Sequence, residues 1–252
     1  MTDEDVYVIT GAAGGMGMAC AEALSGRGTL LLVDVNADDL AASERHLRAA
    51  GATVLTARCD VTASAEVFDL AEGIRAVGVF RGLVHTAGVS PEMADGRTVL
   101  DVDLVGSARV MDAMQPLVGR GSCAVLIGSI ASYADVLPAV ETLLDEPLRP
   151  SFIDEVEAAL GFELDGPTAY VLAKRGVVRL VERLAAPWGS RGGRTVAIAP
   201  GLIDTPMGRL ELARQPIMPA MIAATPIKRP EQQLPGRPID IAAASAFLLS
   251  SD

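Results

Sequence analysis

The chain has 252 residues, of which 50% are hydrophobic, and this length and composition suit one α/β domain with a sizeable core. Its net charge of -11 argues against a nucleic-acid partner, because such partners bind mainly through a positively charged protein surface. The longest stretch without a charged residue has 16 residues and four glycines, too short for a membrane-spanning helix, and the acidic N-terminus does not resemble a secretion signal. We therefore expect a cytoplasmic protein that binds neither membranes nor nucleic acid.

The first predicted element is a strand over Val6–Ile9, a continuous apolar run typical of a strand buried on both faces. A turn containing Gly11, Gly15 and Gly17 follows it, and the spacing from Met16 to Leu24 is helical. Backbone N–H groups at such a helix start can bind a pyrophosphate. Apolar strands also end in glycine for purely steric reasons, so this turn alone leaves both interpretations open.

A second strand is predicted over Thr29–Val33, and it ends at Asp34. In a dinucleotide-binding fold an acidic residue here accepts hydrogen bonds from the adenosine ribose and repels a 2′-phosphate. Asp34 therefore favours NAD over NADP. The alternative is that Asp34 only caps the next helix, Ala37–Ala50, but Asn36 and Asp38 are better placed for capping.

Strands and helices alternate along the rest of the chain. This alternation predicts a single domain, residues 1–252, with a Rossmann-type doubly wound parallel sheet and a ligand at the carboxyl ends of the strands. The further strands are expected at Thr53–Cys59, Leu83–Thr86, Cys123–Ile127 and Thr195–Ile198, and the further helices at about Ser64–Ala76, Val99–Leu117 and Ala169–Ala186.

Two regions interrupt the alternation. Residues 133–168 form an insertion before the last long helix, and it contains a predicted helix over Phe152–Leu160. Residues 206–238 are rich in proline and methionine and poor in charge, which favours a mobile apolar flap over the substrate. The alternative for this second region is a surface loop packed on the core.

The cysteines and histidines give no indication of a metal site. Cys20, Cys59 and Cys123 are too few and too scattered for a disulfide framework or a zinc site. His46 and His85 have no neighbours at metal-ligand spacing, and His85 ends an apolar run, which indicates a structural histidine. We interpret the cysteines as core residues.

Tyr170 and Lys174 are the most informative pair in the sequence. At positions i and i+4 of a helix their side chains share one face, so the ammonium can lie beside the phenol oxygen and make the tyrosine a usable acid/base. Moving a phenol pKa from about 10 to about 7 requires roughly 4 kcal/mol of preference for the phenolate. Ser129, just after the fifth strand, can donate a hydrogen bond to a carbonyl oxygen; Ser132 is the competing candidate.

Taken together, these motifs resemble the short-chain dehydrogenase/reductase family. The matching positions are Thr10 to Gly17, Asp34, Asp60-Val61, Thr86-Ala87-Gly88, Ser129, Tyr170 with Lys174, Pro200-Gly201 with Thr205, and Gly236-Arg237-Pro238. Within the family, the insertion and the Ile-Ala-Pro-Gly segment are similar to bacterial 3α-hydroxysteroid dehydrogenase/carbonyl reductases.

The resemblance implies a nicotinamide dinucleotide and a set of catalytic residues. Tyr170 is implied as the acid/base, Ser129 as the residue that polarises the substrate oxygen, and Lys174 as the residue that holds the nicotinamide ribose and lowers the tyrosine pKa. The implied cofactor-binding residues are Gly11, Gly15, Met16, Gly17, Asp34, Asp60, Val61, Ala87, Gly88, Tyr170, Lys174, Pro200, Ile203 and Thr205, with Thr205 near the carboxamide.

Three positions depart from the family pattern. Asp103 stands where the family usually has an asparagine that holds a water in the proton relay, and a carboxylate adds a charge there. Thr86 replaces a common asparagine. The chain stops at Asp252, where the family continues into a last strand, so we expect either a truncation or a differently built sheet edge.

The sequence therefore predicts an NAD(H)-dependent oxidoreductase that transfers hydride between nicotinamide and a secondary alcohol or ketone, with a bulky apolar, steroid-like substrate. A homo-oligomer is expected by resemblance to the family. One alternative is a dinucleotide-binding sensor or scaffold without turnover, which Asp103 favours. Another is a 3-ketoacyl thioester reductase, for which Arg209, Arg214 and Arg229 could form a basic pocket mouth.

Overall fold

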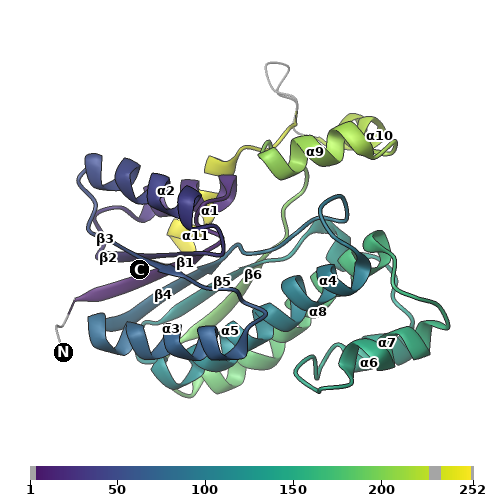
Figure 1. Ribbon diagram of the computed structural model, residues 1–252, viewed down its shortest axis with the longest axis horizontal. Helices are drawn as coiled ribbons and strands as arrows, with labels where there is room; N and C mark the ends of the chain where they lie inside the picture. Colours follow the sequence, from purple (N-terminus) through teal and green to yellow (C-terminus); the bar gives the residue numbers. More distant parts are fainter. Residues whose placement is uncertain (1–3, 227–233, 251–252) are drawn as a thin grey trace.

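The computed structural model describes residues 4–226 and 234–250, and its centre is a six-stranded parallel sheet (Figure 1). The strand order is β3-β2-β1-β4-β5-β6, so the order reverses between β1 and β4, and a crevice forms beyond the carboxyl ends of these strands. The predicted single-domain, doubly wound fold is confirmed. The strands are β1 (Asp5–Thr10), β2 (Thr29–Asp34), β3 (Val54–Arg58), β4 (Val79–His85), β5 (Cys123–Ile127) and β6 (Arg194–Ile198).

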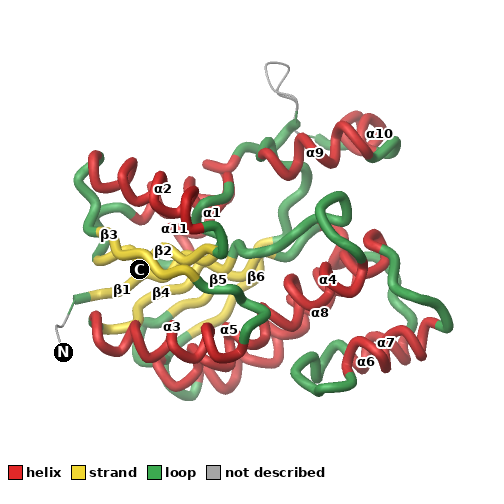
Figure 2. The backbone as a smooth tube through the Cα atoms, in the orientation of Figure 1, coloured by secondary structure: helices red, strands yellow, loops and turns green. Residues whose placement is uncertain are grey.

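Helices cover both faces of the sheet, as Figure 2 shows. One face carries α1 (Gly15–Leu24), α2 (Ala37–Ala49) and α11 (Pro238–Leu248). The other carries α3 (Ser64–Val77), α4 (Gly96–Leu100), α5 (Ser107–Met114) and α8 (Gly166–Gly189).

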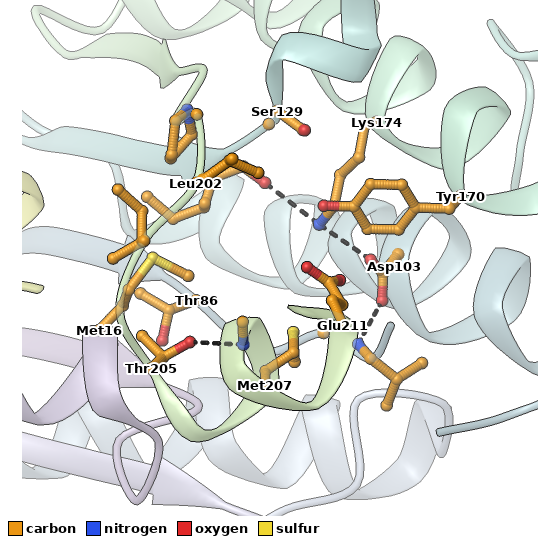
Figure 3. A pocket seen from close by; sticks show the side chains of 18 of the residues that line it. Met16, Thr86, Asp103, Ser129, Tyr170, Lys174, Leu202, Thr205, Met207 and Glu211 are labelled. Atoms are coloured by element: carbon orange, nitrogen blue, oxygen red, sulfur yellow. Dashed lines mark hydrogen bonds and ion pairs between the residues drawn. The ribbon is translucent and has the colours of Figure 1, made fainter. Parts of the chain in front are cut away.

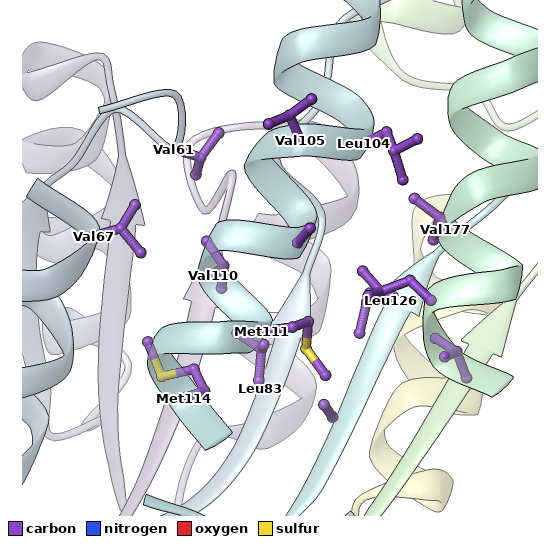
Figure 4. Close-up of a cluster of buried hydrophobic side chains, with 14 of the residues drawn as sticks. Val61, Val67, Leu83, Leu104, Val105, Val110, Met111, Met114, Leu126 and Val177 are labelled. Atoms are coloured by element: carbon purple, nitrogen blue, oxygen red, sulfur yellow. The ribbon is translucent and has the colours of Figure 1, made fainter. Parts of the chain in front are cut away.

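The apolar run of β1 is buried on both of these faces, which explains why it lacks the alternation of a half-exposed strand. Val6 and Val8 join one core cluster, and Tyr7 and Ile9 join the other. Figure 4 shows part of the first cluster, where Met111 of α5 packs between the sheet and α8.

The segment predicted as a helix over about Val99–Leu117 is helical throughout, but its type changes along its length. The chain forms α4, then a π-helical turn over Asp101–Gly106, then α5, and ends in a 3₁₀ turn over Gln115–Leu117. Wide π turns inside helices often occur at functional sites. This one contains Asp103.

The insertion before α8 contains two helices instead of one. The predicted helix Phe152–Leu160 is confirmed as α7, but α6 (Pro138–Leu143) is an additional helix. Their apolar side chains reach the same core as α8; these are Val140, Phe152 and Val156. The α8 helix itself begins before the predicted Ala169, because Asp165 accepts a hydrogen bond from the Thr168 N–H and caps it.

The region predicted as an apolar flap contains α9 (Pro206–Arg214) and α10 (Met218–Ala224). Thr205 caps α9 by accepting a hydrogen bond from the Gly208 N–H, with a distance of 3.0 Å between the two heavy atoms. Residues 227–233 of this predicted flap, and the last two residues of the chain, lie outside the described part of the structure. No strand follows α11 up to residue 250.

The cysteines and His85 are buried, in agreement with the core and structural roles predicted for them. The His85 ring lies between the hydroxyl groups of Thr10, at 2.7 Å, and Ser107, at 3.0 Å. Within residues 4–226 and 234–250 there is no group of three metal-ligating side chains, and no helix long and apolar enough to cross a bilayer.

Candidate active site

Tyr170 and Lys174 lie one turn apart on α8 and face the carboxyl end of β5 (Figure 3). The Lys174 ammonium is 5.4 Å from the centre of the Tyr170 ring. It is also 2.8 Å from a carboxylate oxygen of Asp103 and 3.4 Å from the carbonyl oxygen of Ile127. The ammonium is thus held by a carboxylate as well as lying beside the phenol.

Asp103 is buried and is held at both of its carboxylate oxygens. One oxygen contacts Lys174, and the other accepts a hydrogen bond from the Val89 N–H at 2.7 Å. Gly88 makes room for it, because a Cβ at that position would lie 3.1 Å from the carboxylate. Asp103 therefore connects α8 to the loop after β4.

The two candidate serines have different environments. Ser129 follows β5, and its hydroxyl group lies close enough to Tyr170 to lower the pKa of the phenol. Ser132 is fully buried; its hydroxyl accepts a hydrogen bond from the Ser129 N–H and donates one to the Lys174 carbonyl oxygen at 2.8 Å. Ser132 therefore supports the site, and Ser129 is the serine that faces the tyrosine.

Burial raises the pKa of Tyr170, and this effect outweighs the lowering by Lys174 and by the hydrogen bond with Ser129. The charges of Asp103 and Glu211 raise it further. Lys174 lowers the pKa of Tyr170, as the family resemblance implies, but the net shift of that pKa is upward. Burial is the largest single effect on Lys174 and lowers its pKa, but the combined effects of Asp103, Tyr170 and Glu211 outweigh burial, so the net shift of this pKa is upward.

The glycine turn after β1 forms one wall of a groove of about 790 Å³, a size typical of ligand sites. Gly11 has a φ of 66°, and a Cβ there would lie 2.7 Å from the backbone nitrogen of Ala87. A Cβ on Gly17 would lie 2.1 Å from the Gly11 carbonyl oxygen. Side chains are therefore excluded where a ligand's phosphates would approach the start of α1.

All predicted site residues line this groove or the catalytic pocket beside it. The groove contains Gly11, Gly15, Met16, Gly17, Asp34, Asp60, Val61, Ala87, Gly88 and Thr205. The pocket contains Asp103, Ser129, Tyr170, Lys174, Pro200 and Ile203, and shares Met16, Ala87, Gly88 and Thr205 with the groove.

Carboxylates line the part of the groove around the end of β2. Asp34 accepts hydrogen bonds from the backbone N–H groups of Ala13 and Asn36, both at 3.0 Å. The cap of α2 is Asn36, as predicted, so Asp34 does not have that role. Asp39 and Asp60 also line this groove, and no lysine or arginine does so among the residues that the structure describes.

Glu211 is the charged residue of the described pocket lining that sequence reasoning missed. It lies on α9, in the segment interpreted as an apolar flap, and its side chain reaches the catalytic pocket (Figure 3). No motif singles it out; it is a carboxylate in a proline- and methionine-rich segment, and its nearest charged neighbours are Arg209 and Arg214.

Comparison with known proteins identifies the family. Residues 5–138, more than half of the chain, match the family model described as short chain dehydrogenase. The chain belongs to the short-chain dehydrogenase/reductase family. Residues 157–252 of this short-chain dehydrogenase also match the model described as Enoyl-(Acyl carrier protein) reductase.

Several characterised relatives are similar over nearly the whole chain. A cis-4-hydroxycyclohexanecarboxylate dehydrogenase from Sinomonas cyclohexanicum is 32% identical over 98% of this chain and 90% of its own length. A levodione reductase from Leifsonia aquatica is 31% identical over 98% of this chain and 88% of its own length. The solved structure of a levodione reductase, with 27% identity, gives a TM-score of 0.73 over 100% of this chain and 92% of its own. These similarities show an oxidoreductase family that acts on alcohols and ketones.

Proposed function

We propose that this short-chain dehydrogenase uses NAD(H) to interconvert a cyclic secondary alcohol and its ketone. The observation that carries this proposal is the convergence of Ser129, Tyr170 and Lys174 at the carboxyl end of the sheet, beside the groove that suits a dinucleotide. A nicotinamide bound there supplies the hydride acceptor or donor. The residues of the chain supply the proton transfer and the orientation.

In this mechanism the substrate oxygen lies between the hydroxyl groups of Ser129 and Tyr170. Because the pKa of Tyr170 is raised, its phenol is protonated at neutral pH and can donate its proton to a ketone oxygen. Ser129 donates a hydrogen bond to the same oxygen and stabilises the charge that develops on it. In the oxidation direction the tyrosine must first lose its proton, so alcohol oxidation becomes faster at alkaline pH.

The carboxylates of the groove support NAD rather than NADP. A 2′-phosphate on the adenosine ribose would meet Asp34 and Asp39, and no described cation lines the groove to compensate its charge. One similar fold, an actinorhodin polyketide ketoreductase with 22% identity, was solved with NADPH, so the fold by itself does not decide between the two cofactors.

The lining of the pocket supports an apolar ring as substrate. Its larger apolar side chains include Met16, Leu202, Met207, Met218 and Leu234. The Sinomonas relative is named for a hydroxylated cyclohexane ring, which supports the same class. A steroid-like ring system, implied by the sequence resemblance, is the bulkier member of this class.

The two alternatives have less support. Of the three arginines that could attract a thioester's phosphates, Arg209 pairs with Asp204 at 2.7 Å, Arg214 donates to the Glu92 carbonyl oxygen, and Arg229 lies outside the described residues. The alternative of a sensor without turnover is based on Asp103. It has less support because the Asp103 carboxylate pairs with Lys174 while Ser129 and Tyr170 remain close together.

A cytoplasmic location and a homo-oligomeric state stay predictions.

The test is oxidation of 4-methylcyclohexanol with NAD⁺ and with NADP⁺, followed by the absorbance of the reduced cofactor. We expect turnover with a preference for NAD⁺, and a loss of about 10²-fold or more in Tyr170→Phe, because general acid–base catalysis contributes roughly that much. Unchanged turnover in Tyr170→Phe would refute the proposed mechanism. Tight NADH binding without oxidation of any cyclic or open-chain alcohol would favour the sensor.

A further inference from the structure

Glu211 presents a carboxylate to the catalytic pocket that the proposed reaction does not use. It extends from α9, and in Figure 3 its oxygens lie on the side of Tyr170, Lys174 and Asp103. The carboxylate has no hydrogen bond or ion pair with any other described residue of the chain. A half-buried carboxylate without a partner is costly, and a ligand that supplies one would be stabilised.

The charges in the pocket are not balanced. Among the described residues, its lining contains one cation, Lys174, and two carboxylates, Asp103 and Glu211. Lys174 pairs with Asp103 at 2.8 Å. The ammonium also lowers the pKa of Glu211, but Glu211 has no ion-pair partner of its own among the described residues. The rest of the described lining has no charged side chain, and much of it is apolar.

The groups around Glu211 compensate its charge only in part. Arg214, one turn further along α9, donates a hydrogen bond to the carbonyl oxygen of Glu92 at 3.0 Å and ties the helix to the loop after β4. The Glu92 carboxylate adds a second negative charge nearby. Burial first, and then Glu92, raise the pKa of Glu211, and the opposing effect of Lys174 does not reverse this shift.

We infer that Glu211 selects substrates that carry an ammonium group, so that the preferred substrate is a cyclic amino alcohol or amino ketone. The ammonium pairs with Glu211 while the reacting oxygen contacts Ser129 and Tyr170. The same carboxylate repels an anionic substituent such as a carboxylate or a phosphate. This inference rests on the proposed function, since it places the reacting oxygen at Tyr170.

The test compares three cyclohexanols that differ in charge only at position 4. They are 4-aminocyclohexanol, 4-methylcyclohexanol and 4-hydroxycyclohexanecarboxylate, and kcat/KM is measured for each with NAD⁺ at constant ionic strength. We expect the amine to be preferred over the methyl compound and the carboxylate to be the poorest. In Glu211→Gln the amine-to-methyl ratio should fall about tenfold, which corresponds to 1.4 kcal/mol.

A matched control is Glu163→Gln, the same chemical change at an exposed position of the insertion. This variant should keep the substrate ratios of the natural chain. If the ratios in Glu211→Gln equal those of the natural chain, the inference is wrong. If Glu211→Gln instead weakens binding of NAD⁺ relative to NADH and leaves the ratios alone, the carboxylate serves the nicotinamide cation and the inference is also wrong.

A binding measurement separates this inference from the proposed reaction. Calorimetric titration of the NADH complex with cyclohexylamine and with cyclohexanecarboxylate needs no turnover. Tighter binding of the amine, lost in Glu211→Gln, would support the charge selection even if no alcohol were oxidised, in which case the proposed function alone would fail. Equal binding of the two ligands would overturn the inference whatever the activity.

Discussion

Asp103 acts on two titrating groups at once. It pairs with Lys174 and raises the pKa of that ammonium, and its charge also contributes to the raised pKa of Tyr170. The family's usual asparagine could accept the same hydrogen bond from the Val89 N–H but would carry no charge. The carboxylate therefore maintains the site's geometry and makes the tyrosine a weaker acid.

This leads to a prediction for Asp103→Asn. Because the negative charge that opposes ionisation is removed, the pKa of Tyr170 should fall. Alcohol oxidation requires the ionised tyrosine, so the rising limb of its pH–rate profile should move to lower pH. The measurement is kcat/KM for 4-methylcyclohexanol from pH 6 to pH 11.

The control is Asp112→Asn, the same change at an exposed position of α5. Its pH–rate profile should coincide with that of the natural chain. A limb that stays in place in Asp103→Asn, or that moves to higher pH, would show that the carboxylate does not act on Tyr170 through its charge.

At the scale of elements, the turn between β1 and α1 depends on the absence of side chains. A methyl group on Gly17 would lie 2.1 Å from the Gly11 carbonyl oxygen, which is backbone and cannot rotate away. Gly17→Ala should therefore displace the turn, weaken NADH binding at least tenfold, and destabilise the fold by about 1–3 kcal/mol, as expected for overpacking. Fluorescence titration with NADH and urea unfolding measure the two effects.

Gly73→Ala is the matched control for this turn. Gly73 lies in the middle of α3 on an exposed face, and a Cβ there would meet nothing within 4 Å. The substitution should leave NADH binding unchanged and stabilise the helix by about 0.5–1 kcal/mol, because alanine loses less conformational entropy than glycine. Similar losses of NADH affinity in both variants would contradict the role given to the turn.

The elements that local sequence determines are those that could be predicted. The six strands and the helix Phe152–Leu160 follow from apolar runs and helical spacing. The first half of β4 was missed because Arg81 interrupts its apolar run; Arg81 is paired with Asp5 of the neighbouring strand at 2.7 Å. The π-helical turn was missed because it depends on contacts made after folding: Gly106 lies against Val61, and Asp103 pairs with Lys174.

The whole molecule brings together site residues of two kinds. The catalytic and glycine positions could be predicted, because their roles require particular residue types at particular spacings. Glu211 could not, because its contact with the pocket depends on how α9 lies across the carboxyl ends of the strands (Figure 1). The composition of the pocket therefore depends on how the segments outside the sheet, such as α9 and the insertion before α8, pack against the rest of the molecule.

The insertion is anchored to the catalytic helix by charge pairs. Glu141 of α6 accepts hydrogen bonds from Arg175 of α8, and Asp145, just after α6, pairs with Arg179 of α8. The same α8 helix carries Tyr170 and Lys174, in the turns next to these arginines. Ion pairs that sequence pattern does not reveal thus connect the insertion to the helix on which the site is built.

The last prediction concerns the Asp145–Arg179 pair. The hydrogen bond from Arg179 lowers the pKa of Asp145 below its ordinary value of 3.8, so the carboxylate stabilises the fold above that pH, and this contribution is lost as pH falls through the lowered pKa. Asp145→Asn should reduce the free energy of unfolding by about 0.5–1 kcal/mol at pH 7, the size expected for a partly exposed pair. Urea unfolding of both proteins between pH 7 and pH 3 should show that this difference in unfolding free energy shrinks in acid. The control is Asp69→Asn, because Asp69 is an exposed carboxylate of α3 without an ion-pair partner in the described chain. This variant should match the natural protein at every pH. A difference that persists unchanged in acid would mean that Asp145 stabilises the insertion by packing and not by charge.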